Sequence, residues 1–256
     1  MTVVLHYQSY GQGQPVVILH GMFGSSRNWS VFARKLARHY LVLTVDLRNH
    51  GQSGHAETMS YAEMAGDIRQ FLADRGFEQA SLIGHSMGGK VAMTFALMYP
   101  SMLGKLAVLD IAPVGYRTEF HTLLDSMAAL PLQELNSRRQ ADELLGSTIT
   151  DRQLRQFLLQ NLVQDAAGFR WRINLAALRD GLPDVSGFPT FPAGSRHTGP
   201  TLFLGGSDSR HLQPDYQTAI HGYFSDARIH MIEDAGHWLH IDQPEAVLKQ
   251  IVSFFR

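Results

Sequence analysis

Short apolar runs alternate with helical patterns along the first 110 residues of this chain. The runs at residues 15–19 and 41–45 are rich in β-branched residues and lack polar alternation, which is typical of strands buried on both faces of a parallel sheet. We expect strands at residues 3–10, 15–19, 41–45, 80–83 and 106–109. Ser60, with Glu63 three residues later, has the pattern of a capping box and predicts the start of a helix between two of them. This βαβα order predicts a mainly parallel sheet with helices on both faces.

The alternation stops near Pro113 and resumes at Thr201. The intervening segment is rich in Arg, Gln and Leu, has helical spacing and contains no run from which we expect a strand. After it we expect strands at 201–204 and 228–232, a helix near 215–223 and a last helix after Pro244. A chain of 256 residues suits one domain or two. The pattern favours one α/β core, formed by residues 1–114 and 199–256, with a helical cap inserted at residues 115–198.

Charge and cysteine content exclude several classes of function. The 22 Lys and Arg nearly balance the 23 Asp and Glu, so the basic excess of a nucleic-acid-binding protein is missing. The chain has no cysteine, which rules out disulfides, thiolate nucleophiles and Cys-ligated metals. The N-terminus lacks the pattern of a signal peptide, and no apolar run approaches the length of a membrane span. We therefore expect a cytoplasmic globular protein with neither nucleic acid nor membrane as its partner.

One pentapeptide carries the signature of a catalytic serine. Gly84-His85-Ser86-Met87-Gly88 matches the Gly-x-Ser-x-Gly nucleophile elbow, which sits on a tight turn between a strand and a helix. The motif has that context here, because it follows the strand expected at 80–83 and precedes a helical pattern at 91–98. Its two glycines let neighbouring backbone pass without a clash. The pattern predicts Ser86 as a nucleophile at a helix N-terminus.

A serine hydroxyl needs a base to become a good nucleophile, and the base needs a carboxylate to orient it. His237 lies in the loop after the last expected strand, at the sheet edge where functional loops gather. Two carboxylates compete as its partner: Asp110 ends the strand at 106–109, and Asp208 follows the strand at 201–204. From the residues alone both stay open, because either strand end can reach the histidine loop.

Acyl transfer also needs hydrogen-bond donors for a tetrahedral oxyanion. The backbone N–H of Met87, after the nucleophile, is one candidate, and that of Met22 in the His20–Gly24 loop is the other. Phe23 lies in this loop and Trp238 follows His237, and both are candidate substrate-binding residues. His237 and His240 form an His-x-x-His pair without a further ligand cluster, and no glycine-rich loop has a nucleotide-binding pattern, so we expect neither metal nor cofactor.

These motifs together resemble those of the α/β-hydrolase superfamily. The supporting stretches occur in the family's order and are His20-Gly21, residues 46–53, 84–89 and 236–238. Residues 109–114, 169–175 and 236–240 are similar to the group of esterases that includes YbfF and ABHD11. The resemblance implies a mostly parallel eight-stranded sheet flanked by helices, with an inserted helical cap.

The resemblance also bears on the acid and on the activity. In this group the loop after the strand at 201–204 often has the sequence Gly-Gly-Asn-Ser, which places Asp208 on the asparagine and Ser209 on the serine. An aspartate after the preceding strand then serves instead, so the resemblance favours Asp110, with Asp208 as the alternative. Ser209 is a further candidate substrate-binding residue. The implied activity is hydrolysis of short-chain carboxylic esters, including thioesters, so we expect a small-molecule ester as partner.

The same constellation serves other reactions, so alternatives remain. Perhydrolysis, lactone opening and C–C bond hydrolysis use the same core motif, because specificity depends on the cap. A less favoured reading is a non-catalytic binding protein that retains the hydrolase fold. The leading hypothesis is a serine esterase that forms an acyl-enzyme on Ser86.

Overall fold

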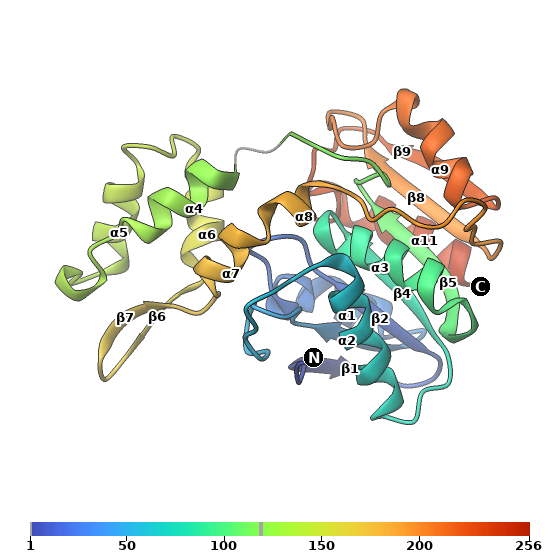
Figure 1. Cartoon of the computed structure of the whole chain (residues 1–256), viewed down its shortest axis with the longest axis horizontal. Helices are drawn as coiled ribbons and strands as arrows, with labels where there is room; N and C mark the ends of the chain where they lie inside the picture. Colours follow the sequence, from blue (N-terminus) through green and yellow to red (C-terminus); the bar gives the residue numbers. More distant parts are fainter. Residues whose placement is uncertain (1, 118–119) are drawn as a thin grey trace.

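Seven strands form a continuous sheet through the centre of the computed structural model, which describes residues 2–117 and 120–256 (Figure 1). All neighbouring pairs are parallel except the first, β1 with β3. The spatial order is β1 (Tyr7–Tyr10), β3 (Leu41–Val45), β2 (Pro15–Leu19), β4 (Ala80–His85), β5 (Leu103–Leu109), β8 (Thr201–Gly206) and β9 (Ala227–Ile232). The predicted α/β order is thus confirmed, and the carboxyl ends of β4, β5, β8 and β9 lie at one edge.

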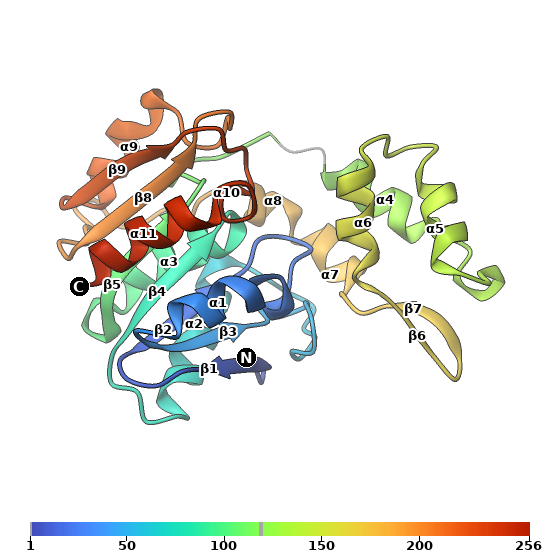
Figure 2. The same ribbon diagram turned by 180° about the vertical axis from the view of Figure 1, so that it is seen from behind.

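Two layers of helices cover the sheet. Helices α1 (Ser30–Leu36) and α11 (Pro244–Phe255) lie on the face that Figure 2 presents. Helices α2 (Tyr61–Ala73) and α3 (Met87–Met98) lie on the face that Figure 1 presents, and α9 (Gln217–Tyr223) connects β8 to β9. The strands supply both cores because successive side chains point to opposite faces. Val16 and Ile18 belong to the core beneath α1 and α11, and Val17 and Leu19 to the other.

Two expectations about strands were wrong. The sheet has seven strands in the described part of the chain, not the eight that the family resemblance implied. The first strand also begins at Tyr7 rather than at Val3, since the preceding backbone bonds to a loop. The carbonyls of Val4 and His6 accept from the N–H groups of Gly54 and Asp46, at 3.0 and 2.9 Å.

The segment between β5 and β8 is mainly helical and lies to one side of the sheet (Figures 1 and 2). Its helices are α4 (Phe120–Ala128), α5 (Arg138–Leu145), α6 (Arg152–Leu159), α7 (Leu175–Asp180) and α8 (Leu182–Ser186). It also contains a hairpin of β6 (Leu162–Asp165) and β7 (Gly168–Trp171), so the expectation of no strand here was wrong. These strands have four residues each, too few to show a clear alternation. No described helix has the length and apolarity needed to cross a bilayer.

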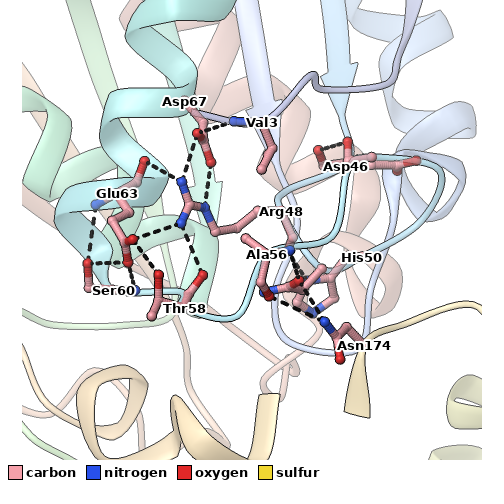
Figure 3. A network of polar contacts seen from close by, with 12 residues as sticks. Val3, Asp46, Arg48, His50, Ala56, Thr58, Ser60, Glu63, Asp67 and Asn174 are labelled. Atoms are coloured by element: carbon pink, nitrogen blue, oxygen red, sulfur yellow. Dashed lines mark hydrogen bonds and ion pairs between the residues drawn. The ribbon is translucent and has the colours of Figure 1, made fainter. Parts of the chain in front are cut away.

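A buried ion pair fixes the loop between β3 and α2 (Figure 3). Arg48 is 1% exposed and donates to both carboxylate oxygens of Asp67, from Nε at 2.6 Å and Nη2 at 2.9 Å. Its Nη1 donates to the carbonyl of Thr58 at 3.0 Å. The Ser60–Glu63 capping box beside it is present as predicted. These contacts hold the loop that carries His50 to the site described next.

Candidate active site

Ser86 occupies the tight turn between β4 and α3. Its backbone has φ 52° and ψ −120°, a left-handed conformation that is strained for a residue with a side chain. The flanking glycines allow this turn. A Cβ on Gly84 would lie 2.3 Å from the carbonyl oxygen of Gly88, and one on Gly88 would lie 2.4 Å from that of Leu19. Ser86 therefore stands half-buried at the N-terminus of a helix, in the geometry that the motif predicts.

Asp110 and His237 meet at the carboxyl ends of the neighbouring strands. The Nδ1 of His237 lies 2.7 Å from Oδ2 of Asp110, at hydrogen-bond distance. Asp110 is fully buried, and its other oxygen accepts from the N–H of Gly206 at 3.1 Å. The Ser209 hydroxyl also donates to Oδ2. The Asp110 carboxylate thus has three hydrogen-bond partners and orients the imidazole of His237. The Nε2 atom of that imidazole is left for a contact with another group.

The two other candidates in the β8 loop lie elsewhere. Asp208 is exposed, and its carboxylate accepts from the hydroxyl of Ser207 at 3.2 Å. The structure therefore brings Asp110, and not Asp208, to His237. Ser209 was a candidate for substrate contact, but it is 6% exposed and lies behind Asp110 rather than on the wall of the cavity that Ser86 and His237 share.

Two further histidines flank His237. The Nε2 of His85 donates to the carbonyl of His237 at 2.8 Å, while the ring of His211 stacks on that of His237 with centroids 3.9 Å apart. Burial lowers the pKa of His85 well below its ordinary value, and burial followed by the nearby His237 lowers the pKa of His211 to about 4. Both flanking rings are therefore neutral near pH 7, so neither adds positive charge beside His237.

The two backbone N–H groups predicted to bind an oxyanion belong to Met22 and Met87. The loop after β2 closes a turn in which Gly24 N–H donates to the Gly21 carbonyl at 3.0 Å. Gly21 lies against Ser86, since a Cβ on Gly21 would be 3.2 Å from Cβ of Ser86. Within the described residues, neither the N–H of Met22 nor that of Met87 has a protein acceptor. Both N–H groups are therefore free to donate to a ligand.

A cavity of about 330 Å³ opens over Ser86 and His237. Its walls are mostly apolar and come from the core and from α4 and α6. They include the predicted Phe23 and Trp238, together with Phe120, Leu123, Leu154 and Phe157. A second cavity of about 30 Å³ lies against Ser86 and is lined by Met87, Lys90, Tyr116 and His211 among others. The smaller space is about the volume of one water molecule.

One cluster in the described residues has the composition of a metal site. Ligand atoms of Asp110, His211 and His237 lie within 4.8 Å of one another. Two of them are already at hydrogen-bond distance, 2.7 Å, and the Ser209 hydroxyl also occupies Oδ2. A hydrogen-bonded proton thus fills the position between carboxylate and imidazole that a cation would need. The residues fit a proton-transfer network better than a metal centre.

The site geometry agrees with comparison to known proteins. The family model for the α/β hydrolase fold matches residues 14–244. The chain is an α/β-hydrolase. Among its relatives, the sn-1-specific diacylglycerol lipase ABHD11 of Danio rerio is 38% identical over 98% of this chain and 81% of its own length. Esterase YbfF of Escherichia coli is 34% identical over 95% of this chain and 94% of its own.

A solved structure supports the same grouping. The structure titled marine microorganism esterase is 34% identical and has a TM-score of 0.95, with 99% of this chain and 100% of that chain covered. The α/β-hydrolase described here therefore belongs to the group that includes YbfF and ABHD11, as the sequence stretches predicted.

Sequence reasoning missed several residues of this α/β-hydrolase site. Lys90 is 2% exposed, and burial lowers its pKa to about 7, while its ammonium donates to the carbonyls of Ser186 and Gly187. His211 stacks on the base, and His50 and Asn161 bond to the loop after β2. Only His50 lies in a stretch, residues 46–53, on which the family resemblance rested. The sequence assigned none of these residues a role, because their roles depend on contacts between segments far apart in the chain. The one sequence signal that could have pointed to Lys90 is the low charge content of its helix, α3.

Proposed function

We propose that this α/β-hydrolase is a serine carboxylesterase that hydrolyses small or short-chain carboxylic esters through an acyl-enzyme on Ser86. The observation that carries the proposal is the 2.7 Å contact between a buried Asp110 and His237, whose ring lines the same cavity as Ser86. The activities named for the relatives, esterase and diacylglycerol lipase, support ester hydrolysis as the reaction.

Acylation begins when the Ser86 oxygen attacks the ester carbonyl and its proton passes to Nε2 of His237. The new C–O bond converts the carbonyl to an oxyanion, which accepts from the N–H groups of Met22 and Met87. The intermediate collapses when the C–O bond to the alcohol breaks and His237 returns the proton to the leaving oxygen. In the described residues no hydrogen bond joins Ser86 to His237; such contacts often tighten only when substrate binds.

Deacylation repeats these steps with water. His237 removes a proton from a water molecule, whose oxygen attacks the acyl carbon and releases the acid and Ser86. In both halves Asp110 holds the imidazole in one orientation and stabilises its charged form. Asp110 is the proposed acid because it contacts Nδ1, whereas the exposed carboxylate of Asp208 bonds, within the described residues, only to Ser207. Ser209 is proposed to support Asp110 rather than to bind substrate.

Residues 115–198 are proposed to form a cap that shapes the substrate pocket. Helices α4 and α6 contribute Phe120, Leu123, Leu154 and Phe157 to the cavity wall. Such a lining favours an apolar acyl or alcohol group over a charged one. The cavity of about 330 Å³ has room for a short ester.

Two measurements on the same preparations test the proposal. Wild-type protein should hydrolyse p-nitrophenyl acetate and butyrate, and a fluorophosphonate probe should label it. Ser86→Ala should lose both turnover and labelling while it keeps the wild-type circular dichroism spectrum. Labelling that persists in Ser86→Ala would overturn the assignment of the nucleophile, and absence of both signals in wild type would favour a binding protein.

A substrate panel then identifies the reaction class. Oxygen esters, thioesters, lactones and peracid formation are assayed with one enzyme batch, and kcat/KM values are compared. We expect the highest values for short oxygen esters or their thioester counterparts. A higher value for a lactone or for perhydrolysis would reassign the reaction while leaving the roles of Ser86 and His237 intact.

A further inference from the structure

The backbone of Phe23 is held from two sides. Its N–H donates to Nε2 of His50 at 3.3 Å, and its carbonyl accepts from Nδ2 of Asn161 at 2.8 Å. His50 belongs to the core loop between β3 and α2, whereas Asn161 lies between α6 and β6, in the segment proposed to be the cap. The residue after Met22 is therefore bonded to both parts of the molecule.

Phe23 also adopts a strained conformation. Its φ is 63°, and it is the third residue of the Gly21–Gly24 turn, a position that normally favours glycine when φ is positive. Phe23 is 3% exposed, and its ring packs edge-on against Phe120 of α4, with centroids 5.6 Å apart. Because the turn is unfavourable for a phenylalanine by itself, contacts from outside the loop are needed to maintain it.

Asn161 is built to make such a contact. It is 4% exposed, and its Nδ2 also donates to the carbonyl of Leu158, at 3.3 Å. Its own carbonyl accepts from the N–H of Arg172, just after β7, at 2.8 Å. Asn161 is thus fixed to both α6 and the β6–β7 hairpin, and its amide group follows the position of these elements. A carboxylate at this position would set an oxygen against the Phe23 carbonyl.

We propose that Asn161 is a positioning residue that links the cap to the oxyanion site. The inference rests on the proposed function, in which Met22 N–H is an oxyanion donor. Met22 precedes the tethered Phe23, so a shift of Asn161 moves the turn that aims this donor. Helix α6 lines the cavity through Leu154 and Phe157. A substrate packed against α6 therefore holds Asn161, and through it the donor, in the productive position.

The test compares two substitutions of Asn161 with a matched control. Asn161→Ala removes the donor, and Asn161→Asp keeps the shape but replaces the donor with an acceptor. The control is Asn174→Ala. The Asn174 amide ties the same segment to the core (Figure 3), with Nδ2 donating to Asn49 Oδ1 and to the Ala56 carbonyl, each at 3.3 Å. Within the described residues no hydrogen bond joins its side chain to the Gly21–Gly24 turn.

We expect kcat to fall about tenfold in Asn161→Ala and further in Asn161→Asp, with KM changed less than about threefold. The inhibition constant of a trifluoromethyl ketone, which forms an oxyanion on Ser86, should rise in parallel with the loss of kcat/KM. Asn174→Ala should keep kcat within about twofold of wild type even where its melting temperature falls as far as that of Asn161→Ala.

Two results would overturn the link. One is an Asn161→Asp variant that folds and keeps wild-type kcat and ketone affinity. The other is an equal loss of kcat in Asn174→Ala, which would show a general effect of loosening the segment. Failure of the proposed function looks different, because wild type itself would then show no turnover and no fluorophosphonate labelling of Ser86.

Discussion

Asp110 and His237 lie 127 positions apart in the chain, yet Oδ2 of one is 2.7 Å from Nδ1 of the other. The parallel order of the sheet makes this possible. Strand β5 carries Asp110 at its carboxyl end, and the loop after β9 carries His237 to the same edge. Asp110 has φ 50°, so the backbone turns sharply at the point where the carboxylate is presented.

Exchange of each aspartate for asparagine separates the two candidate acids. Asp110→Asn leaves the shape but removes the charge that stabilises the imidazolium, so kcat should fall by roughly 10³–10⁴-fold. Asp208→Asn should keep kcat within about twofold, because Asp208 is exposed and its carboxylate bonds, among the described residues, only to Ser207. Steady-state hydrolysis of p-nitrophenyl butyrate by the two variants gives the comparison. Near-normal activity in Asp110→Asn would refute the assignment.

Ser209→Ala tests the support of the carboxylate. The lost hydroxyl donates to Oδ2 of Asp110, and a hydrogen bond to a charged group contributes about 1.5–3 kcal/mol. We expect kcat to fall about tenfold, with a smaller change in KM, since the N–H of Gly206 still bonds to the carboxylate. The control is Ser207→Ala, at an exposed position two residues away, which should leave kcat unchanged. If both variants behaved alike, Ser209 would have no special role.

The order of strands and helices could be predicted from the sequence, because uniformly apolar runs and the Ser60–Glu63 capping box are local signals. The elbow could be predicted as well, because Gly-x-Ser-x-Gly is a local motif and has a strand pattern before it and a helical pattern after it. The start of the first strand and the β6–β7 hairpin could not. The former depends on bonds between the backbone near Val4 and a loop 50 residues away, and the latter has strands too short for a pattern.

The choice between Asp110 and Asp208 shows the same limit. Both follow strands that end at one edge, so periodicity could not separate them, and only resemblance favoured Asp110. The decision depends on which carboxylate turns inward, and the turn at Asp110 is a property of the folded backbone. Asn161 gave no signal at all, because its contact with Phe23 spans 138 positions.

Enlargement of the cavity should change acyl-chain preference. Phe157 of α6 lines the cavity and packs beside Trp238, with ring centroids 5.7 Å apart. Phe157→Ala removes bulk there, so kcat/KM for p-nitrophenyl octanoate relative to butyrate should rise about tenfold. Leu144→Ala, on an exposed part of α5, serves as the control and should leave the ratio unchanged. An unchanged ratio in Phe157→Ala would place the acyl chain elsewhere.

Buried histidines should make the fold sensitive to acid. Burial lowers the pKa of His50 and of His240 to about 3, from an ordinary value of 6.5. Both are neutral when folded but bind a proton when unfolded below pH 6.5, so their contribution to stability is present above pH 6.5 and is lost as pH falls towards 3. At pH 5 each of these two histidines should lower the free energy of unfolding by about 2 kcal/mol relative to its value above pH 6.5.

His240→Phe isolates one of these contributions. The His240 ring stacks on Trp29 with centroids 4.0 Å apart, and its Nδ1 has no hydrogen-bond partner among residues 2–117 and 120–256, so a phenyl ring can replace it. Urea unfolding at pH 7 and pH 5 gives the free energy of unfolding for each protein. The loss between the two pH values should be about 2 kcal/mol smaller in the variant than in wild type. An equal loss would mean that His240 does not titrate on unfolding.

The Arg48–Asp67 pair offers the largest single effect on stability. Both side chains are 1% exposed, and Arg48→Met would leave a buried carboxylate without its cation. We expect the free energy of unfolding to fall by about 3–5 kcal/mol, measured by urea denaturation at pH 7. Arg170→Met breaks an exposed pair with Asp165 and should cost less than about 1 kcal/mol. If the two variants lost similar amounts, the network in Figure 3 would not be what anchors the β3–α2 loop.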